Sequence, residues 1–249
     1  VSIGIFTACI IFPVSILVDG SLTKIERDRI FVIYIIAFFV IFFWAAYEQA
    51  GASLTLFAAE QTDRTIFGWE MPASWIQSFN PFFVVILAAI MPSVWGALNK
   101  RGMEPASPTK QAIGLLLLSL GYLVICFGVK DVQPGVKVSL IWLTGLYFIH
   151  TMGEIALSPI GLSMVNKLTP VRFASLMMGI WYLSTSTANK FAGTLGGLYP
   201  EDGKVKTLLG FRIETMFDFF MVFVIMSGVA SLILFLLSKK LQKMMHGVE

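Results

Sequence analysis

Between Arg29 and Glu60 the chain reads RIFVIYIIAFFVIFFWAAYEQAGASLTLFAAE, and Glu48 is the only charged residue inside this stretch. A helix rises about 1.5 Å per residue, so about 20 apolar residues cross the roughly 30 Å of hydrocarbon in a bilayer. Strands that cross a membrane are about ten residues long and alternate polar with apolar side chains, which this stretch does not do. The stretch therefore predicts a transmembrane helix.

The rest of the chain has the same character. Of its 249 residues, 57% are hydrophobic and only 13% are charged, and the mean hydropathy is +0.81. A soluble protein of this size could not bury so much apolar surface, so the composition excludes a disordered chain, a nucleic-acid-binding arm and an ordinary soluble enzyme. Five further runs carry one charge or none. We therefore predict an all-α membrane protein with six transmembrane helices, at residues 30–57, 74–98, 111–129, 138–165, 172–199 and 213–238.

The segment before the first full helix differs from the rest. Val1 to Val18 is apolar but contains Pro13, and it lacks the basic residues that open a secretory signal. We expect a partial or peripheral helix there, with residues 1–23 forming a linker and residues 24–249 forming the bundle. Because the first residue is not Met, we expect the chain to be a fragment of a longer protein.

The basic residues indicate the orientation of the helices. Short loops make successive helices antiparallel neighbours, and Lys and Arg accumulate in cytoplasmic loops. One side holds eleven basic residues: Lys24, Arg27, Arg29, Lys100, Arg101, Lys110, Lys167, Arg172, Lys239, Lys240 and Lys243. The other side holds six: Arg64, Lys130, Lys137, Lys204, Lys206 and Arg212. The first side is predicted to be cytoplasmic, so both ends of the six-helix bundle lie inside.

Glu154 lies near the centre of its apolar run. A carboxylate at that depth costs about 2.5–3.5 kcal/mol, which favours a functional role. Ser158 and Leu162 follow at four-residue spacing on the same helix face, and Pro159 loosens the helix between them. Glu154 could bind and release a proton, or it could pair with an ammonium group. The alternative is a structural hydrogen bond between helices.

Two other polar positions have open alternatives. Glu48 lies deep in the first helix with Trp44 one turn earlier, which fits either a gating carboxylate beside an aromatic wall or a carboxylate near the outer interface. Asn80 precedes Pro81 at the start of an uncharged helix. It could hold a substrate carbonyl or amide, or it could cap the helix.

For three more residues a packing or interfacial role is favoured over a functional one. Lys190 is the only base inside an apolar run, and its stem could reach the outer interface. His150 lies one turn before Glu154, where a proton relay is conceivable but a helix-packing histidine is expected. Trp181 could line a cavity, although aromatic residues in membrane helices more often pack against lipid or core. Signatures of soluble enzymes are missing from the sequence, so no enzyme activity is expected.

Several motifs resemble the proton-coupled oligopeptide transporters, the POT family. They are FWAAYEQAGASL at 43–54, LFA at 56–58, TDR at 62–64, PASWIQSFNP at 72–81 and GEIALSPIGLS at 153–163. The match runs in register from about residue 24 to the end of the chain. It covers the six helices of that family's C-terminal half.

The resemblance implies a fold and a function. The family belongs to the major facilitator superfamily, with two six-helix bundles around a central site. Residues 1–23 would end the helical hairpin that bacterial members place between the bundles. The chain would be the C-terminal half of a bacterial di- and tripeptide symporter of the cytoplasmic membrane. Its partners would be the peptide, the lipid bilayer and the N-terminal six-helix bundle, with no nucleic acid. Protons would be the coupling ion, with no other cofactor and no metal.

The resemblance also implies roles for single residues. Glu154 would bind the amino terminus of the peptide, with Ser158 beside it, and Asn80 would contact the peptide backbone. Trp44 and Trp181 would form walls of side-chain pockets. Two residues would belong to the gates: Glu48 would join the outer gate by pairing with a basic residue of the other half, and Leu162 would sit at the inner gate.

One departure from the family is large. The ExxER motif of its first helix and a lysine of its fourth helix are not in this sequence, so the cations that hold a peptide carboxylate must come from the other half. Three other hypotheses remain. They are transport of nitrate or another small anion, which Glu154 would repel; a membrane hydrolase using Glu48 and Glu154, for which no nucleophile or metal ligand set is seen; and a non-transporting structural fragment.

Overall fold

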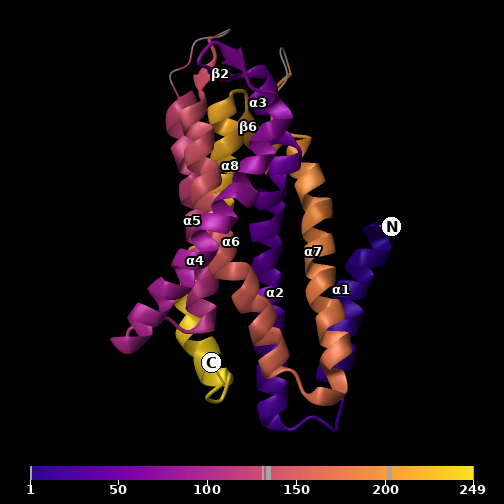
Figure 1. The fold of residues 1–249 in the computed structure, drawn as a ribbon. Coiled ribbons are helices and arrows are strands. Elements are labelled where there is room, and N and C mark those ends of the chain that lie inside the picture. The colour runs from indigo at the N-terminus through magenta and orange to yellow at the C-terminus, as the bar shows by residue number, and fades with distance from the viewer. Residues whose placement is uncertain (1, 131, 133–135, 201–203, 249) are drawn as a thin grey trace.

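The computed structural model describes residues 2–130, 132, 136–200 and 204–248 as a bundle of long helices (Figure 1). The α-helices are α1 (Ser2–Leu17), α2 (Lys24–Tyr47), α3 (Ser53–Glu60), α4 (Phe79–Lys100), α5 (Ser107–Val129), α6 (Leu140–Leu168), α7 (Ala174–Gly196) and α8 (Met216–Met244). Val1 and Glu249, the outer ends of the two predicted segments, lie outside the described residues. So do four of the eight residues of the loop predicted between Val129 and Val138.

Short elements connect the helices. They are the 3-10 helices η1 (Glu48–Gly51), η2 (Ala73–Ser78) and η3 (Val171–Phe173), and the strands β1 (Thr62–Asp63), β2 (Thr65–Ile66), β3 (Trp69–Glu70), β4 (Val138–Ser139), β5 (Lys206–Leu208) and β6 (Phe211–Ile213). β1 pairs in parallel with β4, and two hairpins join β2 to β3 and β5 to β6. The β2–β3 turn needs Gly68, because its φ is +82°.

The all-α prediction is confirmed, but one predicted helix is interrupted. Residues 30–57 do not form a single helix, because α2 ends at Tyr47 and η1 separates it from α3. Polar side chains satisfy carbonyls around the break: the Gln49 amide donates to the carbonyls of Ala45 (3.2 Å) and Ala192 (2.9 Å), and Thr55 donates to that of Ala50 (2.7 Å). Irregular backbone at membrane depth is stable only with such partners.

Two capping boxes explain where α2 and α8 begin. The Thr23 hydroxyl accepts from the Glu26 backbone, and the Glu26 carboxylate accepts in return from the Thr23 backbone at 2.9 Å. Thr215 and Asp218 repeat this arrangement at the start of α8. Each box satisfies backbone donors that the first turn of a helix leaves without partners. Figure 1 shows that the start of α2 and the end of α8 lie at the same end of the bundle.

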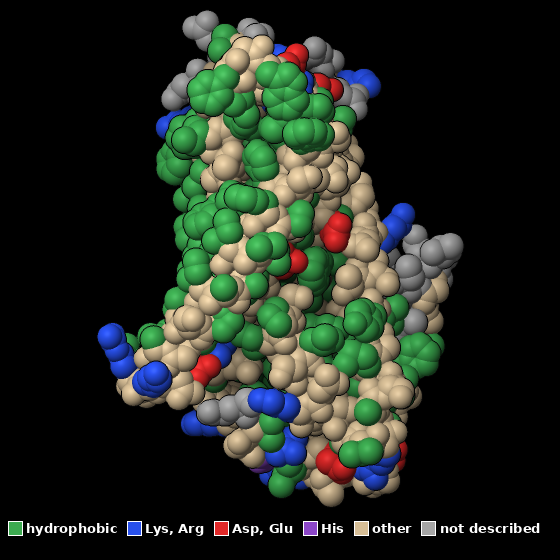
Figure 2. All heavy atoms as spheres, in the orientation of Figure 1, with side chains coloured by type: hydrophobic (Ala, Val, Ile, Leu, Met, Phe, Trp, Pro, Cys, Tyr) green, Lys and Arg blue, Asp and Glu red, His purple; other side chains and the backbone are tan. Residues whose placement is uncertain are grey.

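Five helical segments of the described residues are long and apolar enough to cross a bilayer. They are 24–60, 73–100, 107–129, 140–168 and 216–244. The remaining predicted helix, at residues 172–199, is present as α7, which has 23 residues but is less apolar. Figure 2 shows hydrophobic side chains over the middle of the visible face and most Lys and Arg side chains toward its two ends. This distribution is that of a membrane protein.

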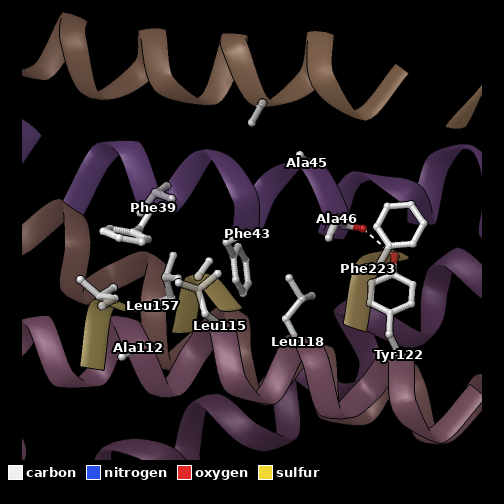
Figure 3. Packing of buried hydrophobic residues seen from close by; sticks show 14 of the residues in the cluster. Phe39, Phe43, Ala45, Ala46, Ala112, Leu115, Leu118, Tyr122, Leu157 and Phe223 are labelled. Atoms are coloured by element: carbon white, nitrogen blue, oxygen red, sulfur yellow. Dashed lines mark hydrogen bonds between the residues drawn. The ribbon is translucent and has the colours of Figure 1, made fainter. Parts of the chain in front are cut away.

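The core lies where α5 packs against α6 and α8. A Cβ on Gly114 of α5 would come within 2.8 Å of the Leu157 Cβ and 3.0 Å of the Gly153 carbonyl oxygen, so the two backbones meet closely. Figure 3 shows Phe43 of α2 entering this layer, and the Tyr122 hydroxyl donates to the Ala46 carbonyl at 2.6 Å. These contacts fix α2 and α6, the two helices that carry most of the candidate site.

Candidate functional site

Glu154 is the centre of a hydrogen-bonded cluster that joins three helices. Its Oε2 atom accepts from the Tyr47 hydroxyl at 2.5 Å and from the Asn80 amide at 2.9 Å. The Asn80 amide also donates to the Tyr47 hydroxyl and, at 3.2 Å, to the Thr151 hydroxyl. Tyr47 belongs to α2, Asn80 to α4, and Thr151 and Glu154 to α6. We call these four residues the Glu154 cluster.

Local structure places each member of the Glu154 cluster. Tyr47 is the last residue of α2, and Asn80 lies in the first turn of α4 just before Pro81. Thr151 and Glu154 are three residues apart and therefore share one side of α6. The Thr151 hydroxyl donates to the Tyr147 carbonyl at 2.7 Å, which leaves its oxygen to accept from Asn80.

The cluster stabilises a carboxylate that would otherwise be costly at this depth. A hydrogen bond to a charged group is worth about 1.5–3 kcal/mol, so two donors offset an insertion cost of about 2.5–3.5 kcal/mol. Both donors meet Oε2, and in the described part of the chain the structure assigns no hydrogen bond to Oε1. Glu154 is half-buried, so that second oxygen can receive an external donor such as an ammonium group.

An aromatic wall adjoins the cluster. The Tyr47 ring stacks on Phe43 with centroids 5.5 Å apart, and Trp44 meets Tyr47 edge to face at 5.4 Å. The predicted residue Trp44 is half-buried and therefore reaches Glu154 through Tyr47. Glu48 follows as the first residue of η1, with an exposed side chain.

The other predicted residues lie farther along α6 and α7. Ser158 is half-buried one turn after Glu154, and Leu162 is exposed one turn beyond it. Trp181 is buried, and a Cβ on Gly161 would come within 2.6 Å of its ring. The structure therefore brings Asn80 into the Glu154 cluster and Trp44 beside it. Ser158 and Leu162 follow Glu154 by one and two turns toward the C-terminal end of α6, and Trp181 of α7 packs against α6 at Gly161. The roles of these three residues stay predictions.

His150 lies beside the cluster, with its ring centroid 6.2 Å from that of Tyr47, but it bonds elsewhere. Its Nε2 atom lies 3.2 Å from the Leu118 carbonyl of α5, and its ring packs on Tyr122 with centroids 4.7 Å apart. A Cβ on Gly121 would overlap this ring at 2.3 Å. The histidine thus packs between α5 and α6, as expected, and takes no part in the hydrogen bonds of Glu154.

Sequence reasoning missed two members of the cluster. Tyr47 gives a weak signal, because it is one of many aromatic residues in α2, yet it directly precedes Glu48 and follows Trp44 by three residues. Thr151 precedes Glu154 by three residues, which is the spacing of one helix face. Among the described residues, no group of three or more His, Cys, Asp and Glu side chains is placed to hold a metal ion.

Two cavities lie at the ends of the bundle. One of about 660 Å³ lies between the α4–α5 loop and α6, and Glu104, Lys110 and Ser163 contribute to its wall. The other, of about 970 Å³, includes Glu60 and Tyr199 near the opposite end. Neither is lined by Glu154. The Glu154 cluster therefore lies apart from both cavities, where α2, α4 and α6 meet.

The fold and the cluster define an all-helical membrane protein with an internal carboxylate held by three helices. The sequence profile of the POT family, PTR2, matches residues 6–209. The chain belongs to this family of transporters. The resemblance drawn from the motifs is thereby confirmed.

Curated relatives carry related names. The chain is 37% identical to the peptide transporter YePEPT of Yersinia enterocolitica subsp. palearctica serotype O:3 (strain YE-P4), over 74% of this chain and 36% of that protein. It is 30% identical to dipeptide and tripeptide permease A of Escherichia coli (strain K12), over 88% of this chain and 43% of that protein. The chain thus spans less than half the length of these relatives.

Solved structures agree in fold. The peptide transporter POT in complex with sulfate superimposes with a TM-score of 0.86 at 29% identity, covering 98% of this chain and 47% of that one. A POT family transporter in complex with 5-aminolevulinic acid superimposes with a TM-score of 0.82 at 27% identity, covering 95% of this chain and 46% of that one. The major facilitator bundle predicted from the sequence is therefore confirmed as the fold.

Proposed function

We propose that this chain supplies the C-terminal six-helix bundle of a bacterial symporter that carries di- and tripeptides with protons. The carrying observation is the free oxygen of Glu154, presented at mid-membrane by Tyr47 and Asn80. A zwitterionic peptide offers an ammonium group to such an oxygen, and relatives of this chain are named for peptide transport. A small anion such as nitrate is disfavoured, because the Glu154 carboxylate would repel it.

The positions of the site residues support one role for each of them. Glu154 accepts the peptide ammonium, with Ser158 one turn away, and Asn80 has an amide oxygen that can meet a peptide N–H. Trp44 borders the peptide-binding space beside Tyr47. Trp181 of α7, which packs against Gly161 of α6, bounds a pocket for a peptide side chain on the other side of Glu154 from Trp44. The neutral and anionic contacts thus come from this half.

The cationic contacts and the gating come from the assembled transporter. A peptide carboxylate needs a cation, which the N-terminal bundle provides. Exposed Glu48 pairs with a basic residue of that bundle at the outer gate, and exposed Leu162 closes the inner gate. Protonation of a gate carboxylate removes one side of its ion pair and thereby favours opening of that gate. Protons serve as the coupling ion, and we expect no organic cofactor, metal or catalytic activity.

The proposed setting is the bacterial cytoplasmic membrane. The start of α2 and the end of α8 lie at the same end of the bundle, which carries the larger share of Lys and Arg. The excess of basic residues favours a cytoplasmic position for that end. The rocking of two bundles about a midplane site then exposes Glu154 to each side in turn.

Uptake of a labelled dipeptide into proteoliposomes under an inward proton gradient tests this function. We expect uptake by the transporter made from its whole gene and none by this 249-residue chain alone. Glu154→Gln keeps the size of the side chain but removes its charge, so proton-driven uptake should be abolished. Undiminished transport by this variant would refute the role of Glu154. No uptake by the whole transporter would make a small anion the next ligand to test.

A further inference from the structure

The β2–β3 hairpin, which lies between α3 and α4, has one apolar and one polar face. Ile66 lies opposite Trp69, and Thr65 lies opposite Glu70, in its antiparallel register. Opposed residues share one face of a hairpin, and successive residues alternate between the two faces. The first pair therefore forms an apolar face and the second pair a polar one. Both pairs are exposed in the structure.

The turn of this hairpin presents a phenylalanine. Phe67 is fully exposed, and its φ of +49° lies in the left-handed region. Turns of this kind usually place Asn, Asp or Gly at that position, because a bulky side chain is strained there. The described chain gives the Phe67 ring no cover in return for this strain. A contact outside the described chain would give this large apolar side chain a use.

A contact with η2 fixes the depth of the apolar face. The Trp69 ring lies against the Trp75 ring, with centroids 5.4 Å apart, and both side chains are half-exposed. Trp75 is the third residue of the segment 73–100, which is long enough and apolar enough to cross a bilayer. Both rings therefore lie near one end of a membrane span. We call Ile66, Phe67, Trp69 and Trp75 the hairpin patch.

The base of the hairpin is held by Arg64. Its guanidinium forms an ion pair with Glu70 at 2.8 Å and donates to the Met71 carbonyl. The Met71 N–H donates in return to the Arg64 carbonyl at 3.0 Å, and the Met71 side chain is buried. Phe67 is three residues from Arg64, so its backbone lies within about 10 Å of this base. The hairpin patch is thus kept at the level where the span ends.

The mixed composition of the hairpin favours the surface of the bilayer as its partner. Aromatic rings, those of Trp above all, gather at the level of the lipid headgroups, where the ring meets acyl chains and the indole N–H meets water. Charged Arg64 and Glu70 directly adjoin the hairpin patch in sequence. Figure 2 shows hydrophobic and charged side chains side by side at the end where Figure 1 places β2. A surface that changes from apolar to charged across one hairpin fits a boundary between hydrocarbon and water.

We propose that the hairpin patch inserts into the headgroup region of the bilayer and anchors this end of the chain to the membrane surface. In the orientation proposed above, this is the outer leaflet. Phe67 reaches the boundary of the acyl chains, while Thr65 and Glu70 on the opposite face meet water. Because only η2 separates the hairpin from α4, the anchor also holds the start of the helix that carries Asn80. The inference does not depend on which substrate is transported.

Collision rates of nitroxide labels test the anchor without any transport measurement. Single labels are attached to Phe67→Cys on the hairpin patch, to Thr65→Cys on the polar face as the matched control, and to Val229→Cys on α8 as the reference for lipid exposure. The whole transporter is used in vesicles, with its own cysteines replaced by alanine. We expect oxygen, which dissolves in lipid, to relax the Phe67 label several-fold more than a water-soluble nickel complex does. The Thr65 label should show the reverse order.

Three outcomes of this measurement would overturn the anchor. Relaxation of both hairpin labels chiefly by the nickel complex would mean that the whole hairpin stands in water. Weak relaxation of the Phe67 label by both reagents would mean that another part of the transporter covers it. Spin–spin broadening between labels on separate molecules, lost on dilution with unlabelled protein, would mean that a second copy covers it.

Tryptophan fluorescence gives a second measurement that needs no label. Lipids brominated next to their headgroups quench indole rings that lie among those headgroups. Trp69→Phe should therefore remove a quenched component of the emission, whereas Trp181→Phe should remove an unquenched one, because Trp181 is buried. An unchanged quenched component in Trp69→Phe would overturn the placement of the hairpin patch. If the unaltered transporter takes up no peptide, the proposed function fails while both measurements still decide the anchor.

Discussion

Tyr47 holds the most informative position at the scale of single residues. Its hydroxyl donates to the Glu154 carboxylate, and its ring is fixed between Phe43 and Trp44. Loss of a hydrogen bond to a charged group costs about 1.5 kcal/mol or more, which is about tenfold in affinity. Tyr47→Phe should therefore raise KM for a dipeptide by about tenfold, because the carboxylate that we propose as the acceptor of the ammonium group loses a donor.

Tyr34→Phe is the matched control for that measurement. It removes a hydroxyl from the same helix, where the Tyr34 oxygen lies 3.6 Å from the Met177 sulfur and far along the chain from Glu154. Its KM should stay at the value of the unaltered transporter. If Tyr47→Phe also left KM unchanged, the hydroxyl would have no part in presenting Glu154.

At the scale of elements, close contact between α5 and α6 holds the helix that carries Glu154. Gly114→Ala would force a Cβ against the Leu157 Cβ and the Gly153 carbonyl, and backbone atoms cannot move aside cheaply. Overpacking of this kind costs about 1–3 kcal/mol, which exceeds the gain of about 1 kcal/mol from replacing glycine in a helix. The variant should be less stable, with a lower melting temperature in detergent.

Gly96→Ala on α4 supplies the control, because a Cβ there would meet nothing within 4 Å. It gains helix propensity without overlap, so its melting temperature should equal or exceed that of the unaltered protein. Equal melting of the Gly114→Ala variant and the unaltered protein would contradict close packing of α5 on α6.

The positions of the helices could be predicted from the sequence, but the break after Tyr47 and the Glu154 cluster could not. The charge-free runs located the helices, because apolar length alone decides what crosses a bilayer. The break after Tyr47 was not predicted, because it depends on Gln49 reaching the Ala192 carbonyl, 143 residues away in sequence. For the same reason Glu154 and Asn80 were recognised singly. Tyr47 and Thr151 were missed, since only the packing of α2, α4 and α6 brings all four together.

For the molecule as a whole, burial is uneven among the helices. In the apolar windows of α2 and α5, 56% of the residues are buried, whereas in that of α4 only 11% are. The side of the bundle with α2 and α5 is thus a packed core, while α4 and α7 have faces that the rest of the described chain does not cover. Glu154 also keeps an oxygen without a donor among the described residues. These features are expected of a half whose central site is completed by a second bundle.

Carboxyl groups at the two ends of the molecule, Glu104 and Asp63, make its stability depend on pH. The Lys110 ammonium and the Asn99 amide lower the pKa of Glu104 from its usual 4.5, and the Thr65 backbone N–H lowers the pKa of Asp63 from its usual 3.8. A carboxyl whose pKa is lower in the folded state contributes stability above its unfolded pKa. That stability is lost as the pH falls through the folded pKa.

The melting temperature in detergent should therefore be constant near neutral pH and decline as the pH falls below about 4.5. Glu104→Gln should lower the melting temperature at pH 7 and reduce the further loss in acid, because that carboxyl no longer titrates. High salt should weaken the difference between the two proteins, since this loop is near water. Melting curves that change identically with pH in both proteins would show that the pair of Glu104 and Lys110 does not hold the α4–α5 loop against α5.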